Sequence, residues 1–152
     1  MVRFGVGALL SLAAAGSLAA QRGRPPREPL AVVANAAVPD RALSPAQVRR
    51  IFLARQRFWA DGSPVEPVNL PATSPVRDTF SRAILGRPPR DLVEFWNDLY
   101  FHGIQPPPVV DSERAVLLYV ARTPGAVGYV SESALPPPAE RTGYRTVLVV
   151  RP

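Results

Sequence analysis

Strand-like apolar runs alternate with amphipathic helical patterns along this chain. This alternation is the sequence feature that most restricts the folds that the chain can adopt. The run LAVVAN (30–35) is continuously apolar and bounded by turn residues, which is typical of a buried strand. Further strands are expected at PVEPVNL (64–70), where Pro67 indicates an edge or an irregularity, at AVGYV (126–130) and at YRTVLVV (144–150). Strands separated by helices predict the α/β class, here a three-layer sandwich with a mostly parallel sheet.

Four helices are expected between these strands. The first follows the N-cap Ser44 and has a proline at its first position, and the second runs from about Pro75 to a closing glycine at Gly86. The third covers about residues 89–101, and the fourth follows Ser112. No internal repeat is visible in this order, which favours a single folded unit.

The first twenty residues have the features of a secretory signal peptide. Arg3 provides a positive charge, residues 4–20 are apolar or small and uncharged, and small residues up to Ala19 fit the positions that a signal peptidase recognises. The apolar run is short for a membrane span, although an uncleaved anchor stays open as the alternative. We therefore expect export to the periplasm, with cleavage after Ala19 or Ala20.

The part that follows the signal peptide divides into a leader and one domain. Residues 21–29, QRGRPPREP, are polar and proline-rich, and we expect them to be disordered. Residues 30–152 are enough for one hydrophobic core. The chain has no cysteine, so in an oxidising compartment this domain has to be stable through packing alone, without disulfides.

The net charge is +6, and all 18 basic residues are arginines. These arginines are scattered along the chain, and no basic stripe with interleaved aromatic residues is present. Nucleic acid is therefore not expected as a partner. A generally positive surface does favour anionic ligands through long-range attraction.

No arrangement of residues in the sequence supports catalysis. His102 is the only histidine, and at the end of a helix it can simply hydrogen-bond free carbonyl groups. Asp91, Glu94 and Asp98 share one helix face, which is more often solvated than an acid–base pair. The sequence has no cluster of histidines and carboxylates dense enough to bind a metal. It also has no glycine-rich phosphate loop. We expect no enzyme activity, no catalytic residue, no metal and no cofactor.

The stretch NLPATSPVRDTF (69–80) is the place where the sequence suggests binding. The start of a helix offers free backbone N–H groups and the positive end of its dipole to an anion. Thr73 and Ser74 add hydroxyl donors, and Arg77 adds a guanidinium group one turn further. Ser74–Pro75 is also an ordinary helix cap, and the proline removes one N–H donor, so capping alone stays open as an explanation.

Several of these segments together resemble the phosphate-binding proteins of phosphate ABC transporters, which belong to the type II periplasmic binding-protein superfamily. The resemblance rests on IFLARQRFW (51–59), on the hydroxyl-rich turn before DTF (78–80), and on VARTPGAVGYV (120–130). It covers about residues 30–135 and implies the fold of the second lobe of a protein that has two. It also implies a binding function in phosphate transport.

The resemblance also indicates where the ligand would bind. The family's Arg-x-x-x-Ser-Gly-Thr motif falls on NLPATSP, with Asn69 at the arginine, Thr73 at the serine and Ser74 at the glycine. The ligand-binding segments of the first lobe have no counterpart in this chain. The resemblance therefore implies a half-site made by Asn69, Thr73, Ser74, Val76 and Arg77, which would bind phosphate or another small oxyanion weakly.

Two functions stay open at this point. In the first, the chain is an exported relative of phosphate-transporter substrate-binding proteins. It would then work with a membrane transporter or another envelope protein, and a homodimer could complete the half-site. In the alternative, the chain is a non-catalytic periplasmic interaction module that has lost ligand binding.

Overall fold

The computed structural model describes residues 27–152. The predicted signal peptide, 1–20, and most of the predicted leader lie outside the described residues. Two residues before Leu30 already form hydrogen bonds with the rest of the domain. The carboxylate of Glu28 accepts from the N–H of Ser133, and the carbonyl of Pro29 accepts from the N–H of Glu132. Among residues 27–152, no helix is long and apolar enough to span a membrane.

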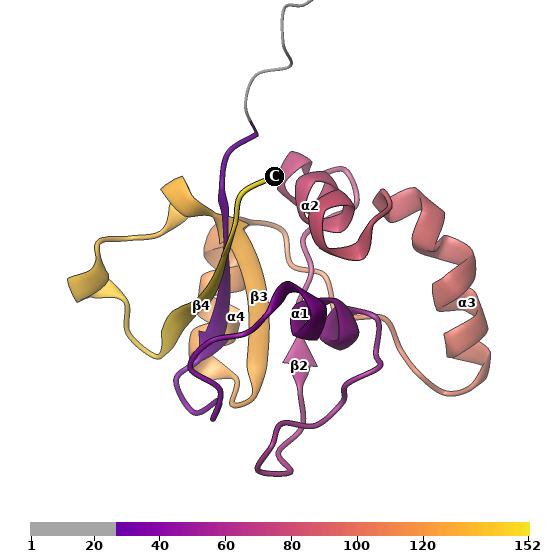
Figure 1. Cartoon of the computed structure of the whole chain (residues 1–152), viewed down its shortest axis with the longest axis horizontal. Coiled ribbons are helices and arrows are strands. Elements are labelled where there is room, and N and C mark those ends of the chain that lie inside the picture. Colours follow the sequence, from indigo (N-terminus) through magenta and orange to yellow (C-terminus); the bar gives the residue numbers. More distant parts are fainter. Residues whose placement is uncertain (1–26) are drawn as a thin grey trace, which may run out of the picture.

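Residues 27–152 form one four-stranded sheet and four α-helices (Figure 1). Two of the helices are joined to other helical turns. A π-helical turn, Ser81–Leu85, continues α2, and a 3₁₀ turn, Pro89–Leu92, precedes α3. Two further 3₁₀ turns, Glu132–Ala134 and Pro138–Glu140, lie between β3 and β4. The elements are β1 (Leu30–Asn35), α1 (Pro45–Phe52), β2 (Glu66–Pro67), α2 (Pro75–Phe80), α3 (Val93–Phe101), α4 (Glu113–Arg122), β3 (Ala126–Ser131) and β4 (Tyr144–Val150).

The sheet is mostly antiparallel, so the predicted α/β class is confirmed but the predicted parallel sheet is wrong. The strand order is β2-β3-β1-β4. β1 pairs antiparallel with β3, from Leu30 opposite Ser131, and antiparallel with β4, from Leu30 opposite Val150. Only the two-residue strand β2 runs parallel to its neighbour β3. β1 is therefore the central strand of an antiparallel trio, and every one of its residues is buried.

Helices cover both faces of this sheet. A Cβ atom added to Gly128 of β3 would lie 2.6 Å from Val116, so this face packs against α4. The side chain of the next residue, Tyr129, points to the opposite face, because successive side chains of a strand alternate. There its ring contacts Phe52 of α1 and Phe80 of α2. Figure 1 shows the same arrangement, with α4 behind the sheet and α1 in front of it.

Three of the predicted helix starts agree with the structure. Ser44 forms a full capping box with Gln47, and Ser74 and Ser112 each accept a hydrogen bond from a backbone N–H in the first turn of their helices. Each hydroxyl oxygen thereby satisfies a donor that the helix itself leaves unpaired. The predicted stop at Gly86 is also observed, with a left-handed φ of 80° that favours glycine.

The third helix departs most from the compact arrangement. It begins as a 3₁₀ turn, and Leu92 of that turn is buried. Within α3 itself no residue is buried, and Tyr100 and Phe101 are 59% and 85% exposed. Figure 1 shows α3 at one side of the molecule, away from the sheet. A helix over about residues 89–101 was predicted correctly, and within α3 only partly buried side chains such as Phe95 and Trp96 pack against the core.

Asn35 joins the end of β1 to the end of α4. Its Nδ2 donates to the carbonyl oxygens of Val120 and Ala121, at 2.7 and 3.2 Å, and its Oδ1 accepts from the N–H of Ala37 at 2.9 Å. The side chain therefore satisfies carbonyl groups that a helix end leaves unpaired.

Replacing Asn35 by alanine is expected to lower the free energy of unfolding by about 2 kcal/mol, because buried carbonyl groups lose their donor. Urea denaturation followed by circular dichroism measures the change. Asn97→Ala on the exposed surface of α3 serves as the control and should leave stability nearly unchanged. Equal losses in the two variants would contradict the proposed role of Asn35.

Candidate functional site

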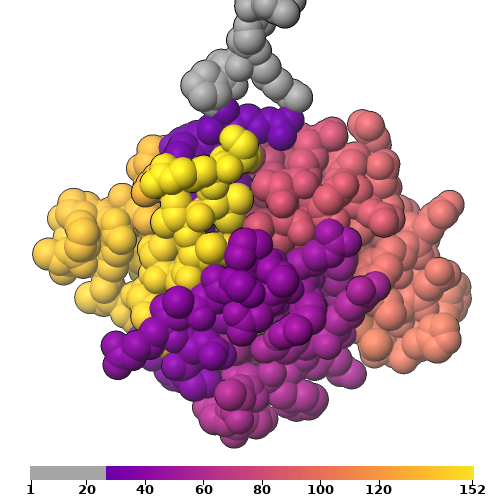
Figure 2. Space-filling model, viewed as in Figure 1, coloured from indigo at the N-terminus to yellow at the C-terminus, as the bar shows by residue number. Residues whose placement is uncertain are grey.

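The stretch singled out by the sequence lies where β2 leads into α2. β2 and β3 are parallel, with Glu66 opposite Ala126 and Pro67 opposite Val127. The start of α2 therefore lies toward the carboxyl ends of both strands, the part of an α/β fold at which ligands commonly bind. Figure 2 shows the surface at this end, where the yellow C-terminal residues lie beside the pink segment that contains α2.

Asn69 is held by hydrogen bonds to two other segments of the chain. The residue is only 8% exposed, and its Oδ1 accepts a hydrogen bond of 3.0 Å from the hydroxyl of Tyr129. Its backbone N–H donates to the carbonyl oxygen of Pro108, and its own carbonyl accepts from the N–H of Val110. Asn69 therefore attaches the 108–110 segment to the edge of the sheet through its backbone, and its side-chain oxygen is used inside the protein.

Tyr129 anchors the inner side of the same turn. Its ring stacks on that of Phe80 with 3.8 Å between centroids, and Phe52 meets both rings edge to face. Burial raises the pKa of the Tyr129 hydroxyl, while the nearby positive charge of Arg77 and the N–H of Leu70 partly offset this effect. The hydroxyl therefore stays protonated at neutral pH and can donate to Asn69.

The other four predicted residues come together on one turn of the chain. Thr73 is exposed, and Ser74 and Val76 are half-buried. The Ser74 hydroxyl oxygen accepts from the N–H of Arg77 at 3.4 Å, and the Ser74 carbonyl accepts from the N–H of Asp78. Pro75 has no N–H to offer. The backbone N–H of Val76 is thus the free donor within the first turn, next to the hydroxyl of Thr73.

Arg77 brings a positive charge to this turn. Its Nη1 donates to the carbonyl oxygen of Leu70 at 2.7 Å, which holds the half-buried guanidinium beside the turn. Among residues 27–152, the ion pairs join Arg82 to Asp78 and Arg90 to Asp91, so Arg77 forms none. Its charge is therefore not neutralised by a carboxylate and remains available to an anion.

Two other polar side chains, His102 and Glu113, have structural partners. His102 places Nδ1 2.7 Å from the carbonyl oxygen of Asp98, which is the helix-end role expected from the sequence. The carboxylate of Glu113 accepts from both the N–H and the hydroxyl of Ser131, at 2.5 and 2.6 Å. Within residues 27–152 no group of three or more histidine, cysteine or acidic residues is placed to hold a metal ion.

A pocket of about 370 Å³ lies beside the outer edge of β2, and the sequence analysis did not predict it. None of the five predicted site residues lines it. Its walls come from the segment after α1, from β2, from Trp96 of α3 and from residues 103–108. The prolines of residues 106–108 favour an extended segment, but they do not indicate a cavity, since a cavity depends on how α3 and β2 are spaced.

Comparisons with known proteins give a fold but no close relative. No protein-family model matches the sequence, and no curated protein matches it either. Among solved structures, the chain is similar to one described as a phosphate ABC transporter substrate-binding protein with bound phosphate, from Clostridium perfringens. The two are 17% identical with a TM-score of 0.57, over 82% of this chain and 56% of the other.

Two further structures match in the same way. An ABC-type phosphate transport receptor from Vibrio cholerae is 18% identical, with a TM-score of 0.57, over 82% of this chain and 56% of that one. PstS from Borrelia burgdorferi is 12% identical, with a TM-score of 0.53, over 82% of this chain and 57% of that one. This chain thus has the fold of one lobe of such binding proteins, and it spans just over half of their length. The proteins it resembles are substrate-binding proteins and not enzymes.

Proposed function

We propose that this chain is a periplasmic, single-lobe binding protein for phosphate or another small oxyanion, of the type that serves phosphate ABC transporters. The observation that carries the proposal is the fold, which follows phosphate-binding proteins over 82% of the chain, one of them with phosphate bound. The proposed domain plan is a signal peptide over residues 1–20, a leader over 21–29 and one binding domain over 30–152.

The anion is proposed to bind at the turn before α2. The donors there would be the hydroxyls of Thr73 and Ser74, the backbone N–H of Val76 and the guanidinium of Arg77. Asn69 contributes through the backbone that it fixes, because its side-chain oxygen accepts from Tyr129. Arg77 supports the proposal most directly, because it forms no ion pair within residues 27–152.

Binding at this half-site is expected to be weak. An anion on an open turn keeps much of its water, so each charge-assisted hydrogen bond contributes less than in a closed site. A dissociation constant of about 1 mM corresponds to about 4 kcal/mol. A second copy of the chain or an envelope protein that covers the turn would exclude this water and raise the affinity.

A thermal-shift titration with sodium phosphate and sodium sulfate tests the site. At a phosphate concentration twenty times the dissociation constant, the melting temperature is expected to rise by about 6 °C, which corresponds to about 2 kcal/mol. Sodium chloride at equal ionic strength corrects for screening. Repeating the titration at two protein concentrations reveals whether a dimer binds more tightly.

Two variants assign the effect to this turn. Thr73→Ala combined with Arg77→Ala should abolish the phosphate-dependent rise, whatever it does to the melting temperature without ligand. Arg90→Ala removes the same charge from an exposed position and should keep the rise. A rise that persists in the double variant would place the anion elsewhere, and no rise in the parent protein would leave the interaction module as the better hypothesis. Sub-micromolar binding by the monomer would contradict the weak half-site.

A further inference from the structure

The pocket beside β2, here called the edge pocket, exists because the outer edge of β2 is covered at both ends but not in the middle. On one side, the N–H of Val65 donates to the carbonyl of Arg57. On the other side, the N–H of Asn69 donates to the carbonyl of Pro108. Between these contacts lies Pro67, which has no N–H with which to bind a further segment. The chain therefore diverges around Pro67 and leaves a hollow of about 370 Å³.

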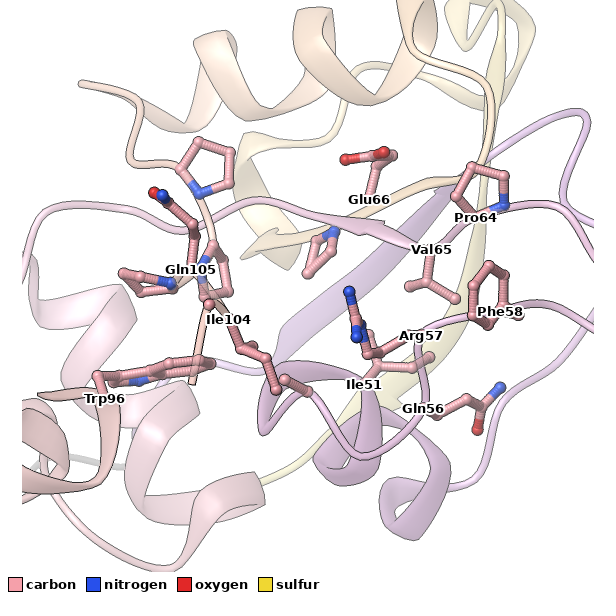
Figure 3. Close-up of a pocket in the computed structure, with 16 residues that line it drawn as sticks. Ile51, Gln56, Arg57, Phe58, Pro64, Val65, Glu66, Trp96, Ile104 and Gln105 are labelled. Atoms are coloured by element: carbon pink, nitrogen blue, oxygen red, sulfur yellow. The ribbon is translucent and has the colours of Figure 1, made fainter. Parts of the chain in front are cut away.

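Most of the residues that line the edge pocket are apolar, although polar groups contribute nearly as much of its surface. Trp96 of α3 lies on one side, Ile104 lies between it and the sheet, and Ile51 of α1 forms part of the floor (Figure 3). Trp96 is only half-buried, and its ring meets that of Phe95 edge to face, with 5.1 Å between the ring centroids. The three prolines of residues 106–108 also line the pocket. Such a lining binds the apolar body of a small molecule, and the volume is at the low end of the roughly 300–1,000 Å³ typical of ligand sites.

One cationic residue, the exposed Arg57, lines this pocket. In Figure 3 the guanidinium of Arg57 points toward the middle of the pocket, and Glu66, which also lines the pocket, directs its carboxylate away from Arg57. Neither of the ion pairs within residues 27–152 includes Arg57 or Glu66. The positive charge of Arg57 is thus not neutralised by a neighbouring carboxylate. A carboxylate ligand would find both charge complementarity and the fork of N–H donors that suits it.

We propose that the edge pocket binds a small organic anion with an apolar body, such as an aromatic or branched aliphatic monocarboxylate. The carboxylate pairs with Arg57, and the apolar body packs against Trp96 and Ile104. This site is separate from the turn before α2, since the two share no residue. The proposal therefore does not depend on phosphate binding at that turn.

The probe for the test is 3-phenylpropionate, which joins a carboxylate to an aromatic ring. The chain has two tryptophans, so the indole N–H signals in a ¹H–¹⁵N NMR spectrum can be assigned with the Trp96→Phe variant. The expected result is a saturable shift of the Trp96 signal with a dissociation constant of about 1 mM. Trp59 is buried and donates to the carbonyl of Gly125, so its signal should move little.

Two comparisons decide whether the anion pairs with Arg57. The alcohol 3-phenylpropanol should bind about tenfold more weakly than the carboxylate, because it lacks the charge. Arg57→Gln should weaken the carboxylate by a similar factor, whereas Arg55→Gln, at an exposed neighbouring position outside the pocket, should leave it unchanged. The proposal fails if the Trp96 signal does not saturate, if the alcohol binds as well as the acid, or if the two arginine variants behave alike. Arg77→Ala should have no effect here, which separates this result from the outcome of the phosphate experiment.

Discussion

Replacing Gly125 by alanine is expected to lower the free energy of unfolding by about 3 kcal/mol or more, the sum of a backbone and a packing cost. Gly125 has a φ of +79°, in the left-handed region that disfavours any side chain. An added Cβ atom would also lie 2.2 Å from the carbonyl oxygen of Pro64, far inside the roughly 3.5 Å of a favourable contact. This oxygen belongs to the backbone, so a side-chain rotation cannot relieve the clash.

The consequences of that clash would extend into β2. The carbonyl of Gly125 accepts from the indole N–H of Trp59 and from the backbone N–H of Glu66, each at 3.0 Å. Any shift that separates residue 125 from Pro64 strains both bonds, and with them the short parallel pairing of β2 with β3. Chemical denaturation with the m-value compared between variants measures the loss.

Gly62→Ala is the matched control for this prediction. Gly62 has nearly the same φ, +82°, but an added Cβ atom there would meet nothing within 4 Å. Its loss should be about 1–2 kcal/mol, the conformational cost alone. If Gly125→Ala cost no more than Gly62→Ala, the close approach of residues 64 and 125 would not contribute to stability.

The sequence predicted the strands and helix starts well, because apolar runs and capping residues act through contacts between residues that are close in sequence. LAVVAN and YRTVLVV coincide with β1 and β4, and the serine caps mark the helix starts. The direction of the strands was predicted wrongly for a physical reason. β1 is buried on both faces because it is the central strand under helices on each side, and such burial gives a continuous apolar run in parallel and antiparallel sheets alike. Direction is set instead by pairings between residues about a hundred positions apart, such as Leu30 with Ser131.

The candidate site was predicted in part. Four of the predicted residues share one turn because they are neighbours in sequence: Thr73, Ser74, Val76 and Arg77. The sequence Ser74–Pro75 predicts the helix cap that shapes this turn. That Asn69 turns inward could not be predicted, since its partner Tyr129 is 60 positions away. The edge pocket was missed for a similar reason. It depends on Pro67, Arg57 and Trp96, which come from three separate segments.

The inward position of Asn69 leads to a prediction about the arginine that phosphate-binding relatives are expected to carry there. Asn69→Arg should lower the free energy of unfolding by about 3 kcal/mol or more, because a buried charge without a partner is strongly destabilising. The substitution also removes the oxygen that accepts a hydrogen bond from the Tyr129 hydroxyl, and the ring of Tyr129 is stacked on that of Phe80. Phosphate affinity should not rise, since the new side chain would lie away from the free N–H of Val76.

Asn69→Leu is the control that separates the two costs. Leucine is similar in size and uncharged, so it removes only the hydrogen bond with Tyr129, a loss of about 1–2 kcal/mol. Any additional loss in Asn69→Arg therefore measures the burial of the charge. If instead Asn69→Arg were as stable as the parent and bound phosphate more tightly, the arginine would have turned outward to the anion. Residue 69 would then be a ligand position whose charge this chain has lost. Because the phosphate affinity rises in only one of the two cases, one titration beside one unfolding curve distinguishes a structural asparagine from a weakened ligand site.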